Sequence, residues 1–219
     1  MKTRLPAKED ECKHERKSKK KGRAPADTDE RERKGYYAYL SNKYDDRKDT
    51  RDDDDRRVVW TDGSAIEDEA GKMRAGAGVF YGVGNEKNRA LEVQGVQSNQ
   101  RAELTAVLRC LEFEEERVHI KTDSMYVQLG VTIWMSKWKS KAWYKRVQKL
   151  EEIDHADLWQ KLDNIISQRE PGAVKISWVK GHALPRHINC GMTTEEDIWG
   201  NNEADIQAGR ASATAARAA

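Results

Sequence analysis

The stretch VVWTDGSA, Val58 to Ala65, joins a run of β-branched and aromatic residues to an aspartate. Its first residues are typical of a buried strand, which ordinarily ends at a glycine or a neutral turn residue. This strand ends at Asp62, and burying a lone carboxylate is costly unless a partner or a cation compensates its charge. Asp62 therefore either opens a turn with Gly63 or belongs to a site that binds a cation.

The composition predicts one folded unit behind a charged segment. The chain has 219 residues, 36% of them charged, with a net charge of only +2, which suits one domain and a tail. Residues 1–57 are nearly all polar, so we expect them to be disordered, except that GYYAYL (35–40) could dock as a short helix or strand. The folded domain is expected over 58–212, with an Ala-rich tail over 213–219.

The sequence also indicates the state of the cysteines and the compartment in which the protein is expected. Its 3 cysteines lie far apart, which argues against a disulfide framework and predicts free thiols. No apolar run has the length of a membrane span, and no signal peptide is recognisable. We expect an intracellular monomer, nuclear or cytoplasmic. The basic block KSKKKGR (17–23) is read as a solvated segment, with a nuclear address as the alternative.

Periodicity from Val58 onward predicts an α/β fold. Three short strands separated by glycine-containing turns are followed by a helix in which apolar residues repeat at helical spacing. Strands then alternate with helices, which predicts a mixed sheet flanked by helices. The expected strands are 58–62, 75–82, 90–96, 118–123 and 173–179, and the expected helices begin near 98 and 201.

Four carboxylates occupy comparable places in this pattern. Asp62 and Asp123 each end a buried strand, while Glu103 and Asp205 lie in the first turns of two predicted helices. Each alone has an ordinary explanation as a turn residue or a helix-dipole partner. If the strand ends are neighbours, however, the acids converge and repel one another unless they share protons or bind cations. Oxygen ligands of this kind suit Mg²⁺ or Mn²⁺, and two such ions form a clamp for phosphoryl transfer.

At this point the motifs VVWTDGSA, SNQRAEL, KTDSMYV, WVKGH and GNNEAD, in that order, resemble those of type 1 ribonuclease H. The resemblance covers about Val58 to Ser212. It implies a five-stranded mixed sheet with the first three strands antiparallel, and an endonuclease that hydrolyses the RNA strand of RNA/DNA hybrids largely without regard to sequence.

The resemblance also implies site roles. Asp62 would bridge two Mg²⁺ ions, for which Mn²⁺ can substitute, and Glu103 and Asp123 would complete the leaving-group side. Asp205 would hold the ion that activates water. His182, in VKGH, matches a mobile histidine thought to shuttle protons or to help product and metal leave.

The segment 183–200 departs from the family pattern because it is longer than in compact members. We expect a long loop that acts as a lid. Its His187 and Cys190 could join His182 in a zinc site, but no second cysteine pair supports this and we reject it. Residues 195–197, all acidic, are expected to form a solvated surface.

Thr132 to Lys149, TIWMSKWKSKAWYKRVQK, interleaves tryptophans with basic residues and resembles the family's basic protrusion. Basic side chains neutralise phosphates, and aromatic faces pack on sugars or bases. We expect Trp134 and, in part, Trp143 to be core, and Trp138 to contact the DNA strand with Tyr126 in the same channel. The lysines expected to bind nucleic acid are Lys137, Lys139 and Lys141.

A second set of substrate contacts is implied by SNQRAEL. Asn99 and Gln100 match residues that reach into the minor groove, where 2′-hydroxyls distinguish RNA from DNA. Ser98 keeps a hydroxyl that binds a DNA phosphate, but Val96 stands where an arginine is common. A second polar contributor to that phosphate pocket, usually an asparagine, is replaced near His155.

Two alternatives remain from the residues alone. One is a catalytically silent ribonuclease H-like module that only binds nucleic acid or a protein; the presence of all four carboxylates and His182 argues against it. An integrase-like nuclease on the same fold would not explain SNQRAEL or the basic protrusion. Whether the chain is a cellular enzyme or the ribonuclease H domain of a retroelement polyprotein stays open.

Overall fold

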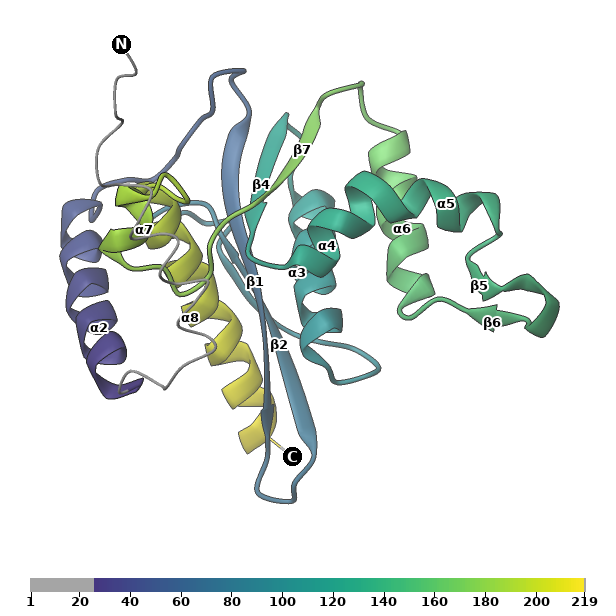
Figure 1. The fold of residues 1–219 in the computed structure, drawn as a ribbon, viewed down its shortest axis with the longest axis horizontal. Helices are drawn as coiled ribbons and strands as arrows, with labels where there is room; N and C mark the ends of the chain where they lie inside the picture. Colours follow the sequence, from purple (N-terminus) through teal and green to yellow (C-terminus); the bar gives the residue numbers. More distant parts are fainter. Residues whose placement is uncertain (1–25, 219) are drawn as a thin grey trace, which may run out of the picture.

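Five strands form a mixed sheet in the order β3-β2-β1-β4-β7 in the computed structural model, which describes residues 26–218 (Figure 1). Pairing is antiparallel between β1 and β2 and between β2 and β3, and parallel between β1 and β4 and between β4 and β7. The predicted mixed sheet with three antiparallel strands is thereby confirmed. The strands are β1 (Arg57–Glu67), β2 (Met73–Phe80), β3 (Arg89–Glu92), β4 (Val118–Thr122) and β7 (Val174–Trp178).

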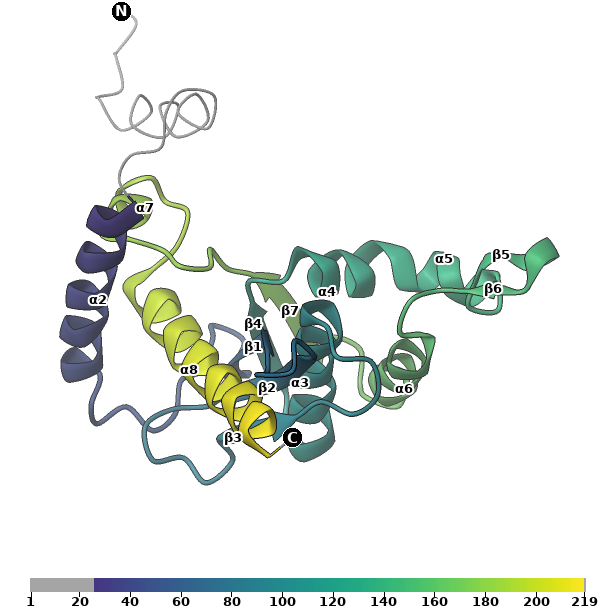
Figure 2. The same ribbon diagram turned by 90° about the horizontal axis from the view of Figure 1, so that it is seen from below.

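Helices cover both faces of the sheet (Figure 2). Alternation along β1 sends Val59 into the core beneath α3, while Val58 and Trp60 enter a second core beneath α8. The helices that carry most of this packing are α3 (Asn99–Phe113), α6 (Ala156–Ser167) and α8 (Glu195–Arg217). The helix predicted near residue 98 therefore starts where expected, and Ser98 caps it by accepting a hydrogen bond from the Arg101 amide at 3.2 Å.

The register of the parallel strands brings two acids together. Thr61 of β1 pairs with Thr122 of β4, so Asp62 and Asp123 follow side by side at the same edge of the sheet. β1 continues past Asp62 to Glu67, so Asp62 does not end its strand as predicted, whereas Asp123 directly follows β4. The two acids meet because the parallel pairing of β1 with β4 stops at Thr61 and Thr122.

The segment between β4 and α6 projects away from the sheet as the basic protrusion, residues 132–149 (Figures 1 and 2). A π-helical turn leads from a short helix into it, and a small hairpin ends it. Its elements and their neighbours are α4 (Met125–Leu129), the π turn Gly130–Trp134, α5 (Met135–Ser140), β5 (Tyr144–Arg146), a 3-10 turn Val147–Lys149 and β6 (Glu151–Glu152).

The N-terminal segment differs from the expectation of disorder. Residues 1–25 lie outside the described part, but helix α2 (Ala26–Lys43) includes GYYAYL and lies beside α8 (Figures 1 and 2). Leu40 is fully buried between α2 and the second core. The prediction of a disordered segment up to residue 57 is therefore wrong for residues 26–57, because one apolar helix face is enough to dock against an existing core.

The C-terminal half also differs from the prediction. Segment 183–200 is not one long loop, since it holds α7 (Pro185–Asn189), and α8 begins at Glu195 with Thr194 as its N-cap. The helix start was predicted near residue 201, six residues late, because the acidic first turn was read as a solvated surface. The predicted Ala-rich tail is mostly the last turn of α8, which continues to Arg217.

The cysteines differ from one another. Cys110 is a free, buried thiol, as predicted. Cys190 is disulfide-bonded, so the expectation of free thiols is wrong for this residue. Among residues 26–218, the helices are too short or too polar to cross a membrane.

Candidate active site

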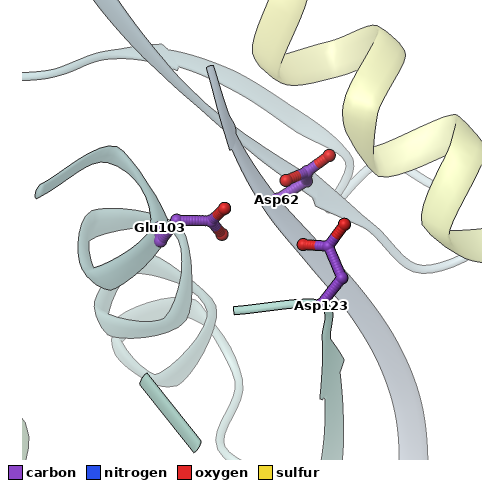
Figure 3. Close-up of side chains that lie close together, drawn as sticks. All are labelled: Asp62, Glu103 and Asp123. Carbon is purple, nitrogen blue, oxygen red and sulfur yellow. The ribbon is translucent and has the colours of Figure 1, made fainter. Parts of the chain in front are cut away.

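Asp62, Glu103 and Asp123 form an acidic cluster at the edge of the sheet (Figure 3). One carboxylate oxygen from each lies within 4.8 Å of those of the other two. Asp62 comes from β1, Glu103 from the second turn of α3, and Asp123 directly follows β4. Three of the four predicted acids are thus brought together.

Two glycines allow this close approach. A Cβ at Gly63 would lie 2.3 Å from the Glu103 amide nitrogen, so only glycine lets α3 pack directly onto β1 beside Asp62. A Cβ at Gly181 would lie 2.1 Å from Asp123 Oδ2, so glycine also lets the loop after β7 pass over the cluster. Gly63 lies within β1 and pairs with Ala77 of β2, so the alternative that Asp62 opens a turn with Gly63 is wrong, and the reason for glycine here is packing.

Burial and mutual repulsion disfavour the charged forms of the cluster. Burial, followed by the charges of Asp123 and Asp205, raises the pKa of Asp62 well above its usual range. Burial, followed by the charges of Asp62 and Asp123, does the same to the pKa of Glu103. Burial also raises the pKa of Asp123, against an opposing hydrogen bond from Asn201. A cation is the partner that would restore ionisation to all three.

The donor set fits a hard divalent cation. Glu103 Oε2 is buried without a hydrogen-bond partner in the part of the chain described, so it has lone pairs available for an ion. Carboxylate oxygens in this arrangement are the ligands that Mg²⁺ and Mn²⁺ prefer.

Asp205 lies on α8 outside the group of three, but near enough that its charge raises the pKa of each member. It is in the third turn of α8 rather than the first, because the helix begins earlier than predicted. Four residues before it, the buried Asn201 donates from Nδ2 to Asp123 Oδ2 at 3.4 Å. Sequence reasoning missed Asn201, although its position one turn before Asp205 in GNNEAD was a usable signal.

His182 is exposed in the loop after β7, with a backbone φ of 49°. Its charge lowers the pKa of Asp123, which places it next to the cluster. His187 is buried, its Nδ1 accepts from the Leu184 amide at 2.8 Å, and Cys190 is disulfide-bonded. Two members of the rejected zinc set, His187 and Cys190, are therefore engaged in structural contacts.

The acidic residues 195–197, which were predicted to form a solvated surface, instead form ion pairs with other parts of the fold. Asp197 is buried and pairs with Lys121, with Nζ and Oδ1 2.5 Å apart. Glu195 pairs with Lys43 and accepts from the Tyr36 hydroxyl at 3.1 Å, and Glu196 pairs with Arg47.

The residues of α3 that are expected to contact substrate lie at the N-terminal end of this helix. Asn99 and Gln100 are exposed at the start of the helix that carries Glu103. Val96 is 63% exposed, so it does not face the core. Its neighbour Arg101 is held by Asp157 in two contacts of 2.9 and 2.6 Å.

In the basic protrusion the predicted lysines, Lys137, Lys139 and Lys141, are all exposed. Trp138 is partly buried against the first core, its ring 5.1 Å from that of Trp159. Trp134, predicted to be core, is only partly buried and contacts Trp138 and Tyr126. Tyr126 accepts from Trp159 Nε1 at 2.8 Å. Trp143, expected to be partly core, packs against the first core.

A mixed sheet whose strand ends gather buried carboxylates opposite an acid on the last helix defines the ribonuclease H-like class of proteins. The RNase H family model matches residues 54–213. The chain belongs to the RNase H family.

Relatives named Ribonuclease H come from bacteria and yeast. The Citrobacter koseri protein is 37% identical over 151 residues, covering 68% of this chain and 92% of that protein. The Schizosaccharomyces pombe protein is 31% identical over 157 residues, covering 71% of this chain and 53% of its own length. The Methylobacillus flagellatus protein is 43% identical over 90 residues, covering 40% of this chain and 56% of its own length. The chain thus spans only part of the last two relatives.

Among solved structures, the solution structure of the PFV RNase H domain has a similar fold. It superposes with a TM-score of 0.56 at 26% identity, covering 72% of this chain and 94% of that domain.

Proposed function

We propose that this protein hydrolyses the RNA strand of RNA/DNA hybrids, using two divalent cations held by Asp62, Glu103, Asp123 and Asp205. The observation that carries the proposal is the buried acidic cluster, because three carboxylates within 4.8 Å of one another are stable as anions only with a cation. Mg²⁺, with Mn²⁺ as a substitute, would stabilise the charge that develops on the phosphate and supply an activated water.

The chain's own residues would position that chemistry. Asn201 orients Asp123 by a hydrogen bond from Nδ2, and the buried Oδ1 of Asn201 has no hydrogen-bond partner among the residues described. The rigid pairing of β1 with β4 fixes the separation of Asp62 and Asp123. His182, exposed beside Asp123, is free to take up or release a proton as the product leaves.

Substrate would be held from two sides of the cluster. Asn99 and Gln100 would enter the minor groove, where 2′-hydroxyls identify the RNA strand, with Ser98 beside a DNA phosphate. Tyr126, Trp138 and the lysines of the basic protrusion would follow the DNA strand. Since these contacts are to backbone and groove shape, cleavage would be largely independent of sequence.

A gel assay with end-labelled duplexes tests the proposal. Hybrid duplexes of several unrelated sequences should be cut in the RNA strand with Mg²⁺ or Mn²⁺, while double-stranded DNA of the same sequences should stay intact. Cleavage of the double-stranded DNA, or of only one hybrid sequence, would contradict the proposed specificity.

A further inference from the structure

Helix α2 lies outside the segment that matches the RNase H family, yet it is firmly attached to the catalytic half (Figures 1 and 2). Leu40 is fully buried beneath it, and Ser41 Oγ donates to Glu203 Oε1 of α8 at 3.2 Å. Lys43 pairs with Glu195 at the start of α8. The helix is thus held along the same part of α8 that carries Asp205.

Tyr37 extends from α2 toward the acidic cluster. Its ring packs against the second core, which includes Ala183 and Ala204, the chain neighbours of His182 and Asp205. Burial raises the pKa of Tyr37 to about 12, the charge of Arg33 opposes this rise, and the charges of Asp205 and Asp123 add to it, so the phenol lies within electrostatic range of all three residues. Its hydroxyl can donate a hydrogen bond.

Arg33 lies one turn before Tyr37, on the same face of α2. It is partly buried, and within residues 26–218 it forms no salt bridge. The adjacent Lys34 is exposed and pairs with Glu30 at 2.8 Å, so these two neighbouring cations differ in their contacts. The charge of Arg33 lowers the pKa of Tyr37, so the guanidinium lies near the Tyr37 ring, and a partly buried guanidinium without an ion pair has donors available for an anion.

We propose that Arg33 and Tyr37 bind the sugar–phosphate backbone of the RNA strand next to the scissile phosphate, making α2 one wall of the substrate channel. This inference rests on the proposed function. The phosphate to be cut must lie at the acidic cluster, so its neighbours on the same strand reach the elements that border Asp205. Arg33 would offset the repulsion between those phosphates and the carboxylates, and the Tyr37 hydroxyl would donate to a phosphate or 2′ oxygen.

The test measures binding separately from cleavage. Fluorescence anisotropy of a labelled RNA/DNA hybrid is recorded in Mg²⁺ over a series of salt concentrations, with every variant carried in an Asp62→Asn background to prevent turnover. We expect Arg33→Ala to weaken binding about tenfold and to flatten the slope of log affinity against log salt by about 0.9, one phosphate contact. Arg33→Lys should keep the slope, and Lys34→Ala, the matched control, should leave slope and affinity unchanged.

Tyr37→Phe keeps the ring in its packing and removes only the hydroxyl. In the otherwise wild-type protein we expect KM for the hybrid to rise about threefold, with kcat and the thermal midpoint unchanged. Equal effects of Arg33→Ala and Lys34→Ala, or no effect of Arg33→Ala in a protein that cleaves hybrids, would overturn the inference and leave the proposed function intact. Failure of the wild-type protein to cleave hybrids at all would overturn both.

Discussion

Lys121 and Asp197 form a buried ion pair, with Nζ and Oδ1 2.5 Å apart, that joins β4 to the first turn of α8. Trp60 Nε1 donates to the same Oδ1 at 3.3 Å. Lys121 is two residues before Asp123, and Asp197 is two turns before Asp205. The ion pair therefore fixes the position of α8 relative to β4. It therefore links strand pairing to the position of the fourth carboxylate.

Asp197→Asn should destabilise the protein by about 3–5 kcal/mol, because it leaves the Lys121 ammonium buried without a counter-charge. Urea unfolding measures this cost. The matched control is Glu30→Gln, which breaks the exposed pair with Lys34 and should leave the free energy of unfolding nearly unchanged. Similar small costs for both variants would show that the pair does not hold α8.

Leu40→Ala should lower the free energy of unfolding by about 3 kcal/mol, because Leu40 is 0% exposed and its removal leaves a cavity between α2 and the second core. Tyr39→Ala, at a residue 51% exposed on the same helix, should cost less than about 1 kcal/mol. If the two costs are equal and small, α2 does not dock in solution.

His119 makes stability depend on pH. It is 6% exposed, its Nδ1 lies 3.0 Å from Asp52 Oδ2, and its Nε2 lies 2.7 Å from Ser177 Oγ. Burial, followed by the charges of Lys175 and Lys121, lowers the pKa of His119 from 6.5 to about 4. Between these values the unfolded chain binds a proton that the folded chain does not, so stability falls as the pH is lowered from 6.5 to about 4.

The loss should reach about 3 kcal/mol at pH 4. In His119→Asn, which keeps a hydrogen-bonding side chain but cannot titrate, this part of the slope should disappear while the loss below pH 4 from carboxylates such as Asp52 remains. Urea unfolding at pH 7, 5.5 and 4.5 compares the two proteins. Parallel pH profiles would show that His119 is not held neutral by the fold.

Val96→Arg should tighten hybrid binding and steepen the salt dependence by about 0.9, since it adds one cation where the phosphate pocket has none. Val96 is exposed, and the nearby Arg101 is engaged by Asp157, so neither burial nor a resident guanidinium opposes the change. Val96→Gln is the uncharged control. An unchanged slope in Val96→Arg would place the pocket elsewhere.

Local pattern predicted the elements that carry the site. Alternation and β-branching located the strands, and the helical spacing of Leu104 and Leu108 located α3 with its cap at Ser98. Asp123 directly follows β4, and Asp62 is the residue of β1 just past the β1–β4 pairing, so their meeting required only the right pairing of β1 with β4. Strand alternation and helical spacing can be recognised within a few consecutive residues, and strand pairing follows from the geometry of the sheet.

Long-range contacts could not be predicted in the same way. Residues 195–197 look solvated because their partners, Lys43, Arg47 and Lys121, are distant in sequence. Helix α2 is mostly polar, and its docking depends on the burial of Leu40 and on contacts with residues of α8 that are distant in sequence. The pairing of Arg101 with Asp157 likewise depends on how α6 crosses α3.

The most direct test of the account is RNA-strand cleavage of a labelled RNA/DNA hybrid by Asp62→Asn, with and without EDTA, beside Asp68→Asn as a control. Asp68 directly follows β1, accepts hydrogen bonds from the Ala70 and Lys72 amides, pairs with Arg74 of β2, and does not belong to the acidic cluster. The account predicts that Asp62→Asn is inactive at any Mg²⁺ or Mn²⁺ concentration while Asp68→Asn cleaves at the wild-type rate and stops when EDTA is added. Full activity of Asp62→Asn, or of the wild-type protein in EDTA, would contradict it.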